Sequence, residues 1–302
     1  MRKVFILTES FQHTGVGHLG RCTALSEILT EKGDRVSIYL DTDGTLLGSN
    51  TPSNLITSNW KDKTQLSKLL NSEKPDVVYI DSYLADDSVY QEVADRVSSL
   101  ICIDDYKRIE YPLGSIILNP GFGGKYLTYD KTHNIIWTGM EHVLLRKPFR
   151  QIDVVKGRKN PNEFTSVLIT VGGEDRYNII PKLTKFLCEF RPDWEKNIII
   201  GPGFRNLKEI EFVIDGNCRL HRNLSAEEMK NLMIQNDLAI SAGGQTTYEL
   251  DRCGTSMILI ETADNQKNNI RGWVDLNVPF IGSADDPLLI DNLRNVLLAI
   301  IK

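Results

Sequence analysis

Short apolar runs alternate with helix-length amphipathic segments along the chain, and this alternation constrains the fold more than any other feature. Strands separated by helices favour a parallel sheet that is covered on both faces. In the first half the pattern predicts buried strands at residues 4–8, 36–40, 77–80, 100–103 and 116–118. It predicts helices near residues 18–32, 61–73 and 86–98.

The alternation restarts after an irregular stretch, residues 119–158, that holds Pro120, Pro148 and several glycines. Strands are predicted at residues 166–171, 197–200, 219–220, 238–241 and 257–260. Helices are predicted at residues 178–190, 207–214, 225–235, 245–252 and 286–301. We therefore expect an α/β protein of two Rossmann-like domains, residues 1–150 and 151–302, facing a central cleft. The last helix is a candidate to cross back onto the first domain.

Composition excludes several classes of protein. A net charge of −5 argues against binding nucleic acid by phosphate neutralisation. No apolar window approaches the ~18 residues of a membrane span, and the N-terminal apolar run is too short for a signal peptide. The five cysteines are widely spaced without C-x-x-C, which argues against a disulfide scaffold and a cysteine zinc site. These features predict a cytoplasmic protein with no stable membrane association, whose oligomeric state stays open.

The loop after the first strand contains a G-x-G-x-x-G pattern, Gly15, Gly17 and Gly20, with Asp41 at about the spacing of a ribose-binding acid. A dinucleotide site is the weaker interpretation. In that motif the first glycine follows the strand directly, whereas about six residues intervene here. His18 also occupies a position where the motif brings helix and strand together.

The stronger interpretation is a glycine-rich loop that exposes His18 at a helix N-terminus. Glycines let the backbone approach a ligand closely, and the helix start favours an anion and a neutral imidazole. A neutral imidazole suits a general base. The alternative is that His18 only bonds its own loop, and for His13 a solvated loop position is as good as a functional one.

Glycine-rich loops also follow the strands of the second half. Gly172 and Gly173 precede two carboxylates, and Gly201, Gly203 and Phe204 end another strand. The run Ser241-Ala242-Gly243-Gly244-Gln245-Thr246 leads from a strand into a helix whose free N–H groups suit a diphosphate.

Other polar residues follow strands of both halves. Glu249, in the first turns of its helix, can accept bonds from ribose hydroxyls or simply stabilise the helix start. Asn265 and Gln266 can bond a substrate, although Asp264 beside them can equally be a helix N-cap. In the first half, Asp81, Tyr83 and Asp104-Asp105 also end strands, and the cysteines at 22, 102 and 253 look like inert core thiols.

Taken in order, these blocks resemble the GT-B architecture, and more narrowly the PseG/SpsG family of UDP-sugar hydrolases, relatives of the lipid-II-forming N-acetylglucosaminyltransferase. The resemblance covers nearly the whole chain. The blocks that carry it are Gly15-Val16-Gly17-His18 with Arg21-Cys22, Asp81-Ser82-Tyr83, Ile103-Asp104-Asp105, Leu118-Asn119, Gly139, Leu145-Arg146-Lys147-Pro148-Phe149, Gly172-Gly173-Glu174-Asp175, Gly201-Pro202-Gly203, Ser241 to Leu250, and Asn265-Gln266.

The resemblance implies removal of UDP from a 2,4-diacetamido-2,4,6-trideoxy sugar for nonulosonic acid (such as pseudaminic acid) or surface polysaccharide biosynthesis, without a metal or other cofactor. His18 would activate water, and Tyr83 and Asn265 would position the sugar. The remaining sugar-side residues implied are Glu9, Gly17, Arg21, Asp81, Asp105 and Gln266. The implied nucleotide side comprises Gly172, Gly173, Gly201, Gly203, Phe204, Ser241, Gly243, Gly244, Gln245, Thr246 and Glu249.

Two other functions stay open. One is a GT-B glycosyltransferase in which His18 deprotonates a sugar or lipid-linked hydroxyl. The other is a nucleotide-sugar binding module without turnover. The sequence also departs from the family, which usually carries an arginine and an aspartate where Leu7 and Glu9 stand here.

Overall fold

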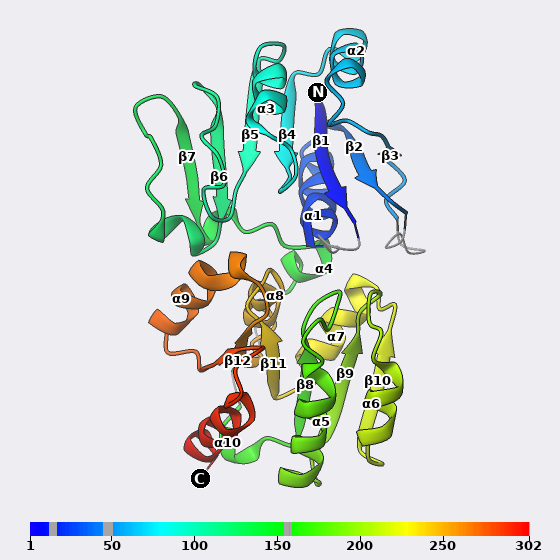
Figure 1. Ribbon diagram of the computed structural model, residues 1–302, viewed down its shortest axis with the longest axis vertical. Coiled ribbons are helices and arrows are strands. Elements are labelled where there is room, and N and C mark those ends of the chain that lie inside the picture. The colour runs from blue at the N-terminus through cyan, green and yellow to red at the C-terminus, as the bar shows by residue number, and fades with distance from the viewer. Residues whose placement is uncertain (12–16, 45–50, 154–156, 158, 302) are drawn as a thin grey trace. The chain divides into compact units, whose positions relative to one another are not determined.

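The computed structural model describes residues 1–11, 17–44, 51–153, 157 and 159–301. The chain splits into two compact units, Met1–Lys147 (unit 1) and Pro148–Lys302 (unit 2). Each unit is built around its own parallel sheet with helices packed on it (Figure 1). The short helix α4 (Lys147–Arg150) lies where the chain passes from one unit to the next.

Unit 1 contains a parallel sheet of seven strands among its described residues, in the order β3-β2-β1-β4-β5-β6-β7. The chain runs from β1 outward to β2 and β3 and then returns to β4 on the other side of β1. The winding therefore reverses between β1 and β4, and ligands of open parallel sheets bind beyond the strand ends at such a reversal. The strands are β1 (Lys3–Ser10), β2 (Arg35–Thr42), β3 (Leu55–Thr57), β4 (Val77–Asp81), β5 (Ser99–Ile103), β6 (Ile116–Pro120) and β7 (Ile135–Gly139).

Both faces of the unit 1 sheet are covered, as successive residues of β1 show. Val4 and Ile6 belong to one core cluster and Phe5 and Leu7 to another, because side chains alternate between the faces of a strand. Helix α1 packs on the Val4 face, and α2 and α3 pack on the Phe5 face. The helical segments are α1 (Gly17–Glu31), α2 (Lys63–Glu73), α3 (Asp87–Ala94), η1 (Gly123–Tyr126) and η2 (Met140–His142).

Unit 2 repeats this plan with a parallel sheet of six strands in its described part, ordered β10-β9-β8-β11-β12-β13. Here the winding reverses between β8 and β11, which makes the end of these two strands the favoured ligand position. The strands are β8 (Ser166–Thr170), β9 (Glu195–Ile200), β10 (Cys218–Arg222), β11 (Leu238–Ala242), β12 (Ser256–Glu261) and β13 (Phe280–Ser283).

Several helices begin at polar residues that accept backbone N–H bonds, which explains why they start where they do. The Asp62 and Asp86 carboxylates cap α2 and α3, and Ser225 forms a reciprocal capping box with Glu228 at α7. The helical segments of unit 2 are η3 (Pro161–Glu163), α5 (Ile179–Phe190), α6 (Leu207–Val213), α7 (Ala226–Gln235), α8 (Thr246–Arg252), η4 (Asp264–Gln266), α9 (Lys267–Asp275) and α10 (Leu289–Ile300).

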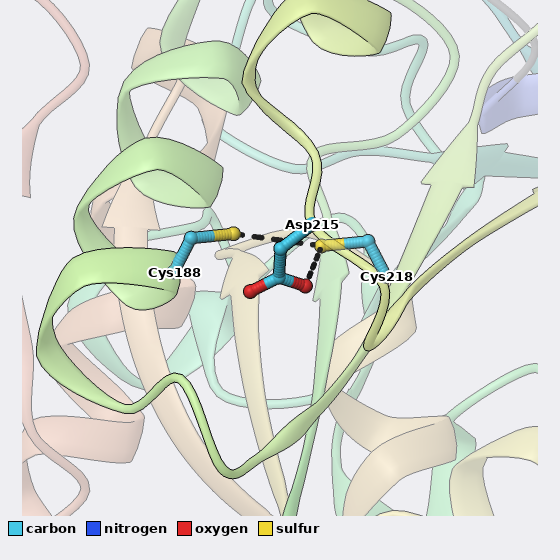
Figure 2. Close-up of side chains that lie close together, drawn as sticks. All are labelled: Cys188, Asp215 and Cys218. Carbon is cyan, nitrogen blue, oxygen red and sulfur yellow. Dashed lines mark hydrogen bonds between the residues drawn. The ribbon is translucent and has the colours of Figure 1, made fainter.

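All five cysteines are free thiols. Cys22, Cys102 and Cys253 are buried, and burial raises the pKa of each thiol, to about 12 for Cys253. The prediction that these three are core thiols is confirmed. Cys188 on α5 and Cys218 at the start of β10 are partly exposed and lie side by side (Figure 2).

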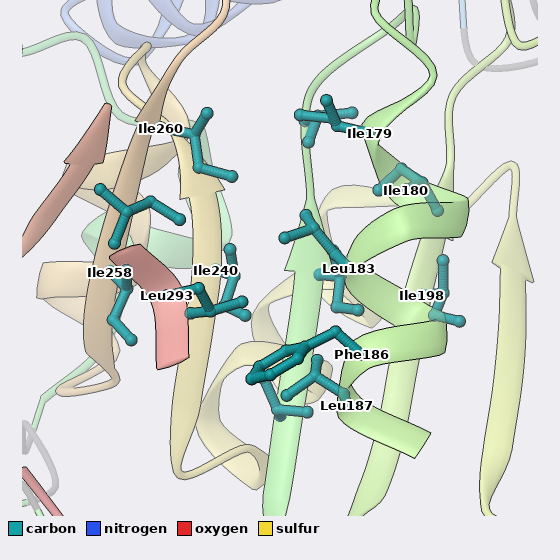
Figure 3. Close-up of a cluster of buried hydrophobic side chains, with 14 of the residues drawn as sticks. Ile179, Ile180, Leu183, Phe186, Leu187, Ile198, Ile240, Ile258, Ile260 and Leu293 are labelled. Atoms are coloured by element: carbon teal, nitrogen blue, oxygen red, sulfur yellow. The ribbon is translucent and has the colours of Figure 1, made fainter. Parts of the chain in front are cut away.

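The core of unit 2 forms where α5 and α10 pack against the sheet. Leu183 and Phe186 of α5 face Ile240 of β11, and Leu293 of α10 lies beside Ile258 of β12 (Figure 3). Burying one apolar side chain of this size stabilises the folded state by about 1.5–3 kcal/mol. The apolar stripe of α5 therefore contributes strongly to the stability of unit 2.

The predicted strands and helices are all present, with their ends shifted by a few residues. The prediction of an irregular stretch at 119–158 is wrong in part, because β7 lies within it. Strands β3 and β13 and helix α9 were also not predicted.

Candidate active site

Glu9 connects the two strands at which the winding of unit 1 reverses. It is the penultimate residue of β1, fully buried, rather than part of the following loop. One carboxylate oxygen accepts hydrogen bonds from the Tyr83 and Leu84 N–H groups, at 2.7 and 3.1 Å. The other accepts from the Ser82 hydroxyl at 2.6 Å and lies 3.4 Å from the Lys61 ammonium. Glu9 therefore fixes the segment after β4 that carries Tyr83.

Arg21 joins two carboxylates that follow neighbouring strands. Its guanidinium donates two bonds to Asp81 of β4, at 2.9 and 2.6 Å, and two to Asp105 after β5, at 2.6 and 3.0 Å. Burial alone would raise the pKa of Asp105, but the Arg21 charge and its bonds outweigh burial, so the pKa of Asp105 lies below its ordinary value. The cluster holds one buried cation between two carboxylates.

Tyr83 extends this cluster to His18. The Tyr83 hydroxyl donates a hydrogen bond to Asp105, and its ring meets the imidazole edge-on with the centroids 4.1 Å apart. The ring position of Tyr83 is thus set at its backbone by Glu9 and at its hydroxyl by Asp105.

His18 is the second residue of α1, as predicted, but the prediction that the loop exposes it is wrong. Only 5% of its surface is accessible, and the Tyr83 ring packs against the imidazole. Neither ring nitrogen has a hydrogen-bond partner among the described residues, and Nδ1 lies 3.9 Å from a Glu9 oxygen.

A buried imidazole without partners is unusual, because buried polar atoms are nearly always hydrogen-bonded. Its nitrogens therefore have the capacity to bond a molecule that binds beside them. The predicted residues His18, Arg21, Asp81, Tyr83 and Asp105 are all brought together at this edge. Gly17 begins α1 beside them, and Gly15 and His13 lie outside the described residues.

Two glycine-rich loops of unit 2 pack directly on each other at the carboxyl edge of its sheet. The Gly203 N–H donates to the Gly173 carbonyl at 2.9 Å. A Cβ atom on Gly201 would come within 2.5 Å of the Gly172 and Gly173 carbonyl oxygens, so no side chain fits there. Gly172 also has a φ of +95°, which favours glycine. The glycines allow this contact between the segments after β8 and β9.

The segment after β11 is equally tight and is held by α9. A Cβ atom on Gly243 would lie 2.2 Å from a side-chain carbon of Ile270. The Asn269 amide donates to the Gly243 carbonyl at 2.7 Å, and the Tyr248 hydroxyl bonds Asn269 in turn. Sequence reasoning missed Asn269 and Ile270 because α9 itself was not predicted.

The other predicted residues of unit 2 occupy varied surroundings. Glu249 is buried in α8, whereas Gln245 and Thr246 at its start are partly exposed. Gln266 exchanges hydrogen bonds with Thr262 at the end of β12, and Asn265 is partly exposed in η4. Phe204 packs into the hydrophobic core, and the Ser241 hydroxyl donates to the Ala242 carbonyl.

The structure decides the alternative that the sequence left open at Asp264, and it shows what Asp104 does. Asp264 is not a helix N-cap, because Gln266 occupies that position of α9 and the Asp264 carboxylate pairs with Lys267. Asp104 forms a turn: it accepts from the Lys107 N–H at 2.7 Å and from two tyrosine hydroxyls.

Neither edge contains three clustered metal-ligating side chains among the described residues. The described part of the chain has one such group, Cys188, Asp215 and Cys218. No described helix has the length and apolarity that crossing a bilayer requires.

No protein-family model matches the chain. An uncharacterized protein of Methanocaldococcus jannaschii is 22% identical over 278 residues, which are 88% of this chain and 57% of that protein. A Helicobacter pylori protein named pseudaminic acid cytidylyltransferase and UDP-2,4-diacetamido-2,4,6-trideoxy-beta-L-altropyranose hydrolase is 24% identical over 267 residues, 87% of this chain and 45% of that protein. The chain thus spans about half the length of these relatives.

Solved structures match the whole chain. MurG of Acinetobacter baumannii aligns with a TM-score of 0.65 at 14% identity, covering 99% of this chain and 91% of MurG. The chain has the GT-B fold. UGT89C1 of Arabidopsis thaliana, complexed with UDP-L-rhamnose, aligns with a TM-score of 0.64 at 13% identity, covering 100% and 90% of the two chains. The predicted two-sheet α/β architecture is confirmed.

Proposed function

We propose that the chain is a hydrolase that cleaves the anomeric C–O bond of a UDP-linked amino sugar and releases UDP and the free sugar. The observation that carries the proposal is the buried imidazole of His18 at the winding reversal of unit 1, which has no hydrogen-bond partner among the described residues. The name of the Helicobacter pylori relative, which includes a UDP-sugar hydrolase, supports the same reaction and suggests a 2,4-diacetamido-2,4,6-trideoxyhexose as the sugar.

In this reaction His18 accepts a proton from water while the water oxygen attacks the anomeric carbon. The C–O bond breaks as the new one forms, and UDP leaves with the bonding electron pair. A base of this kind contributes typically 10²–10⁴-fold to the rate. Tyr83 positions the sugar, and attack on the face opposite UDP inverts the anomeric centre.

The charged side chains of unit 1 already have partners within the unit. Arg21 bonds Asp81 and Asp105, and Glu9 accepts from the Tyr83 N–H, so Tyr83 is held in place without a charged ligand. Their role in this proposal is to position Tyr83 and His18, with Gly17 beside them on the sugar side.

Unit 2 holds the nucleotide in this proposal. The glycine segments follow β8, β9 and β11 at the edge where the sheet reverses, and the N–H groups at the start of α8 stabilise the leaving diphosphate without a metal ion. Glu249 accepts bonds from the ribose hydroxyls. The solved structure of Neisseria meningitidis UDP-GlcNAc 2-epimerase bound to UDP-GlcNAc shares this fold, with a TM-score of 0.56 at 12% identity.

The test is UDP release from a panel of UDP-sugars, including UDP-2,4-diacetamido-2,4,6-trideoxy sugars, with no acceptor added. We expect UDP and free sugar in equal amounts from at least one donor. Tight UDP binding with no release from any donor would contradict the hydrolase.

A glycosyltransferase is the second candidate, because MurG and UGT89C1 share the fold. On the same residues His18 would deprotonate an acceptor hydroxyl instead of water. Adding candidate sugar acceptors to the same assay separates the two: a transferase releases UDP only with the acceptor and yields a glycoside in place of free sugar.

A further inference from the structure

The amino edge of the unit 2 sheet brings two cysteines and an aspartate together. Cys188 comes from the end of α5, Asp215 from the segment before β10, and Cys218 from the first residue of β10 (Figure 2). Thirty residues separate the cysteines in sequence, so no C-x-x-C pattern marks them. The expectation of no cysteine zinc site rested on that spacing alone.

We propose that Cys188, Asp215 and Cys218 bind a thiophilic divalent cation of the Zn²⁺ class. The ligand atoms of the three side chains all lie within 4.8 Å of one another. The two Sγ atoms are 3.6 Å apart, and tetrahedral zinc with Zn–S bonds of about 2.3 Å holds two sulfurs roughly 3.8 Å apart. The sulfurs therefore need almost no movement to share one ion.

The carboxylate is oriented for this role by Lys196. The fully buried Lys196 ammonium lies 2.8 Å from Asp215 Oδ2, while Cys218 Sγ lies 3.3 Å from Oδ1. One oxygen is thus held by the lysine and the other faces the sulfurs. Outer partners of this kind orient metal ligands.

Charge and coordination also balance. On binding, each thiol releases a proton to solvent and forms an S–metal bond, so two thiolates neutralise the divalent ion. Lys196 already neutralises Asp215. Three protein ligands leave a fourth position for water, which the partial exposure of the cluster permits.

The position in the sheet makes this ion structural rather than catalytic. Cys218 pairs in register with Lys196 near the start of β9, whereas the glycine segments follow the ends of β8, β9 and β11. The cluster therefore lies at the opposite edge of the sheet from the proposed nucleotide site. An ion here would fasten the edge strand β10 to α5.

The test is a titration of the reduced full-length chain with Co²⁺ under argon, followed by Zn²⁺. We expect one equivalent of Co²⁺ to produce near-ultraviolet thiolate-to-cobalt absorption that Zn²⁺ abolishes. Cys188→Ser and Cys218→Ser should each remove most of this absorption, and Asp215→Asn should weaken affinity at least 10-fold. Cys253→Ser, a buried thiol elsewhere in unit 2, should bind as the unaltered chain does.

Absence of the absorption in the unaltered chain, or its survival in both cysteine variants, would overturn the proposal. A disulfide is the competing outcome: glutathione disulfide would oxidise the two thiols and be reduced to two glutathione molecules. A chain that forms this disulfide but, once reduced, gives no cobalt absorption would also overturn it. UDP binding, measured on the same samples, should not change with Zn²⁺, which separates this proposal from the proposed function.

Discussion

The two units share a winding pattern, but different kinds of residue stand where the winding of each sheet reverses. At the reversal of unit 1 stand charged side chains: Arg21 is bonded to Asp81 and Asp105, and the buried Glu9 accepts a bond from the Ser82 hydroxyl. At the reversal of unit 2 stand glycines whose backbones touch. A charged cluster fixes side-chain positions, whereas glycine segments let neighbouring loops approach closely. The difference suggests that chemistry depends on unit 1 and ligand retention on unit 2.

The largest effect is expected for His18→Ala, which tests whether turnover depends on unit 1. Loss of a general base should lower turnover of a UDP-sugar by about 10²–10⁴-fold, while UDP affinity, which we assign to unit 2, should stay the same. Steady-state UDP release and calorimetric titration with UDP measure the two quantities. His133→Ala is the control, since that histidine is exposed and pairs with Asp130 on the surface. Full turnover in the His18 variant would show that His18 is not the general base.

The second prediction concerns the stability of the charged cluster. Arg21→Met leaves the buried Asp81 and the partly buried Asp105 without their cation, and breaking a buried pair costs about 3–5 kcal/mol. Urea unfolding should show this loss. Arg2→Met is the matched control, because the Arg2 side chain is largely exposed and an ion pair at the surface is worth at most about 1 kcal/mol. Equal effects of the two variants would mean that the cluster is no more than a surface ion pair.

The sequence indicated which edges matter but not how their side chains pair. Strand ends could be located because apolar runs stop at polar or glycine residues, as at Asp81 and Gly172. That Glu9 bonds the segment after β4 depends on β1 lying next to β4, and strand order is not written in the local pattern. For the same reason the sequence misjudged the exposure of His18, against which the Tyr83 ring packs.

The elements that the sequence did not predict are those with weak burial patterns. Strand β3 has three residues, two of them exposed, so no apolar alternation marks it. Strand β7 has no buried residue, although Ile135-Ile136-Trp137 is apolar. Helix α9 is mainly polar and contains Gly272, and its burial depends chiefly on Ile270 and Trp273. These elements form because tertiary contacts override weak local preference.

A smaller effect tests the glycine segments. Gly243→Ala places a methyl group 2.2 Å from a carbon of buried Ile270, and such overpacking costs typically about 1–3 kcal/mol. Thermal unfolding measured without added metal should show the loss together with weaker UDP binding. Gly216→Ala is the control, since its added carbon meets nothing within 4 Å. Unchanged stability and UDP affinity in the Gly243 variant would show that the close packing there is dispensable.

Glu249→Gln tests the ribose contact. Because an amide replaces a charged acceptor, UDP affinity should fall about 10-fold, in line with roughly 1.5 kcal/mol for a hydrogen bond to a charged group. Calorimetry should show this loss, and turnover at saturating donor should change little. Glu227→Gln, on the exposed side of α7, should bind UDP normally. Unchanged affinity in the Glu249 variant would remove that residue from the nucleotide site.

The smallest expected effect is the pH dependence of the stability that Asp105 contributes to unit 1. Because the pKa of Asp105 is lowered in the folded chain, its ionised form stabilises unit 1 above the unfolded value of about 3.9. This stabilisation disappears as the pH falls through the folded pKa. The stability difference between the unaltered chain and Asp105→Asn, measured by urea unfolding, should therefore be constant from pH 7 to about 5 and shrink below about 4. If this stability difference persists unchanged into stronger acid, Asp105 stabilises unit 1 through packing rather than through its charge. The two units would then differ in the packing of their residues and not in electrostatics.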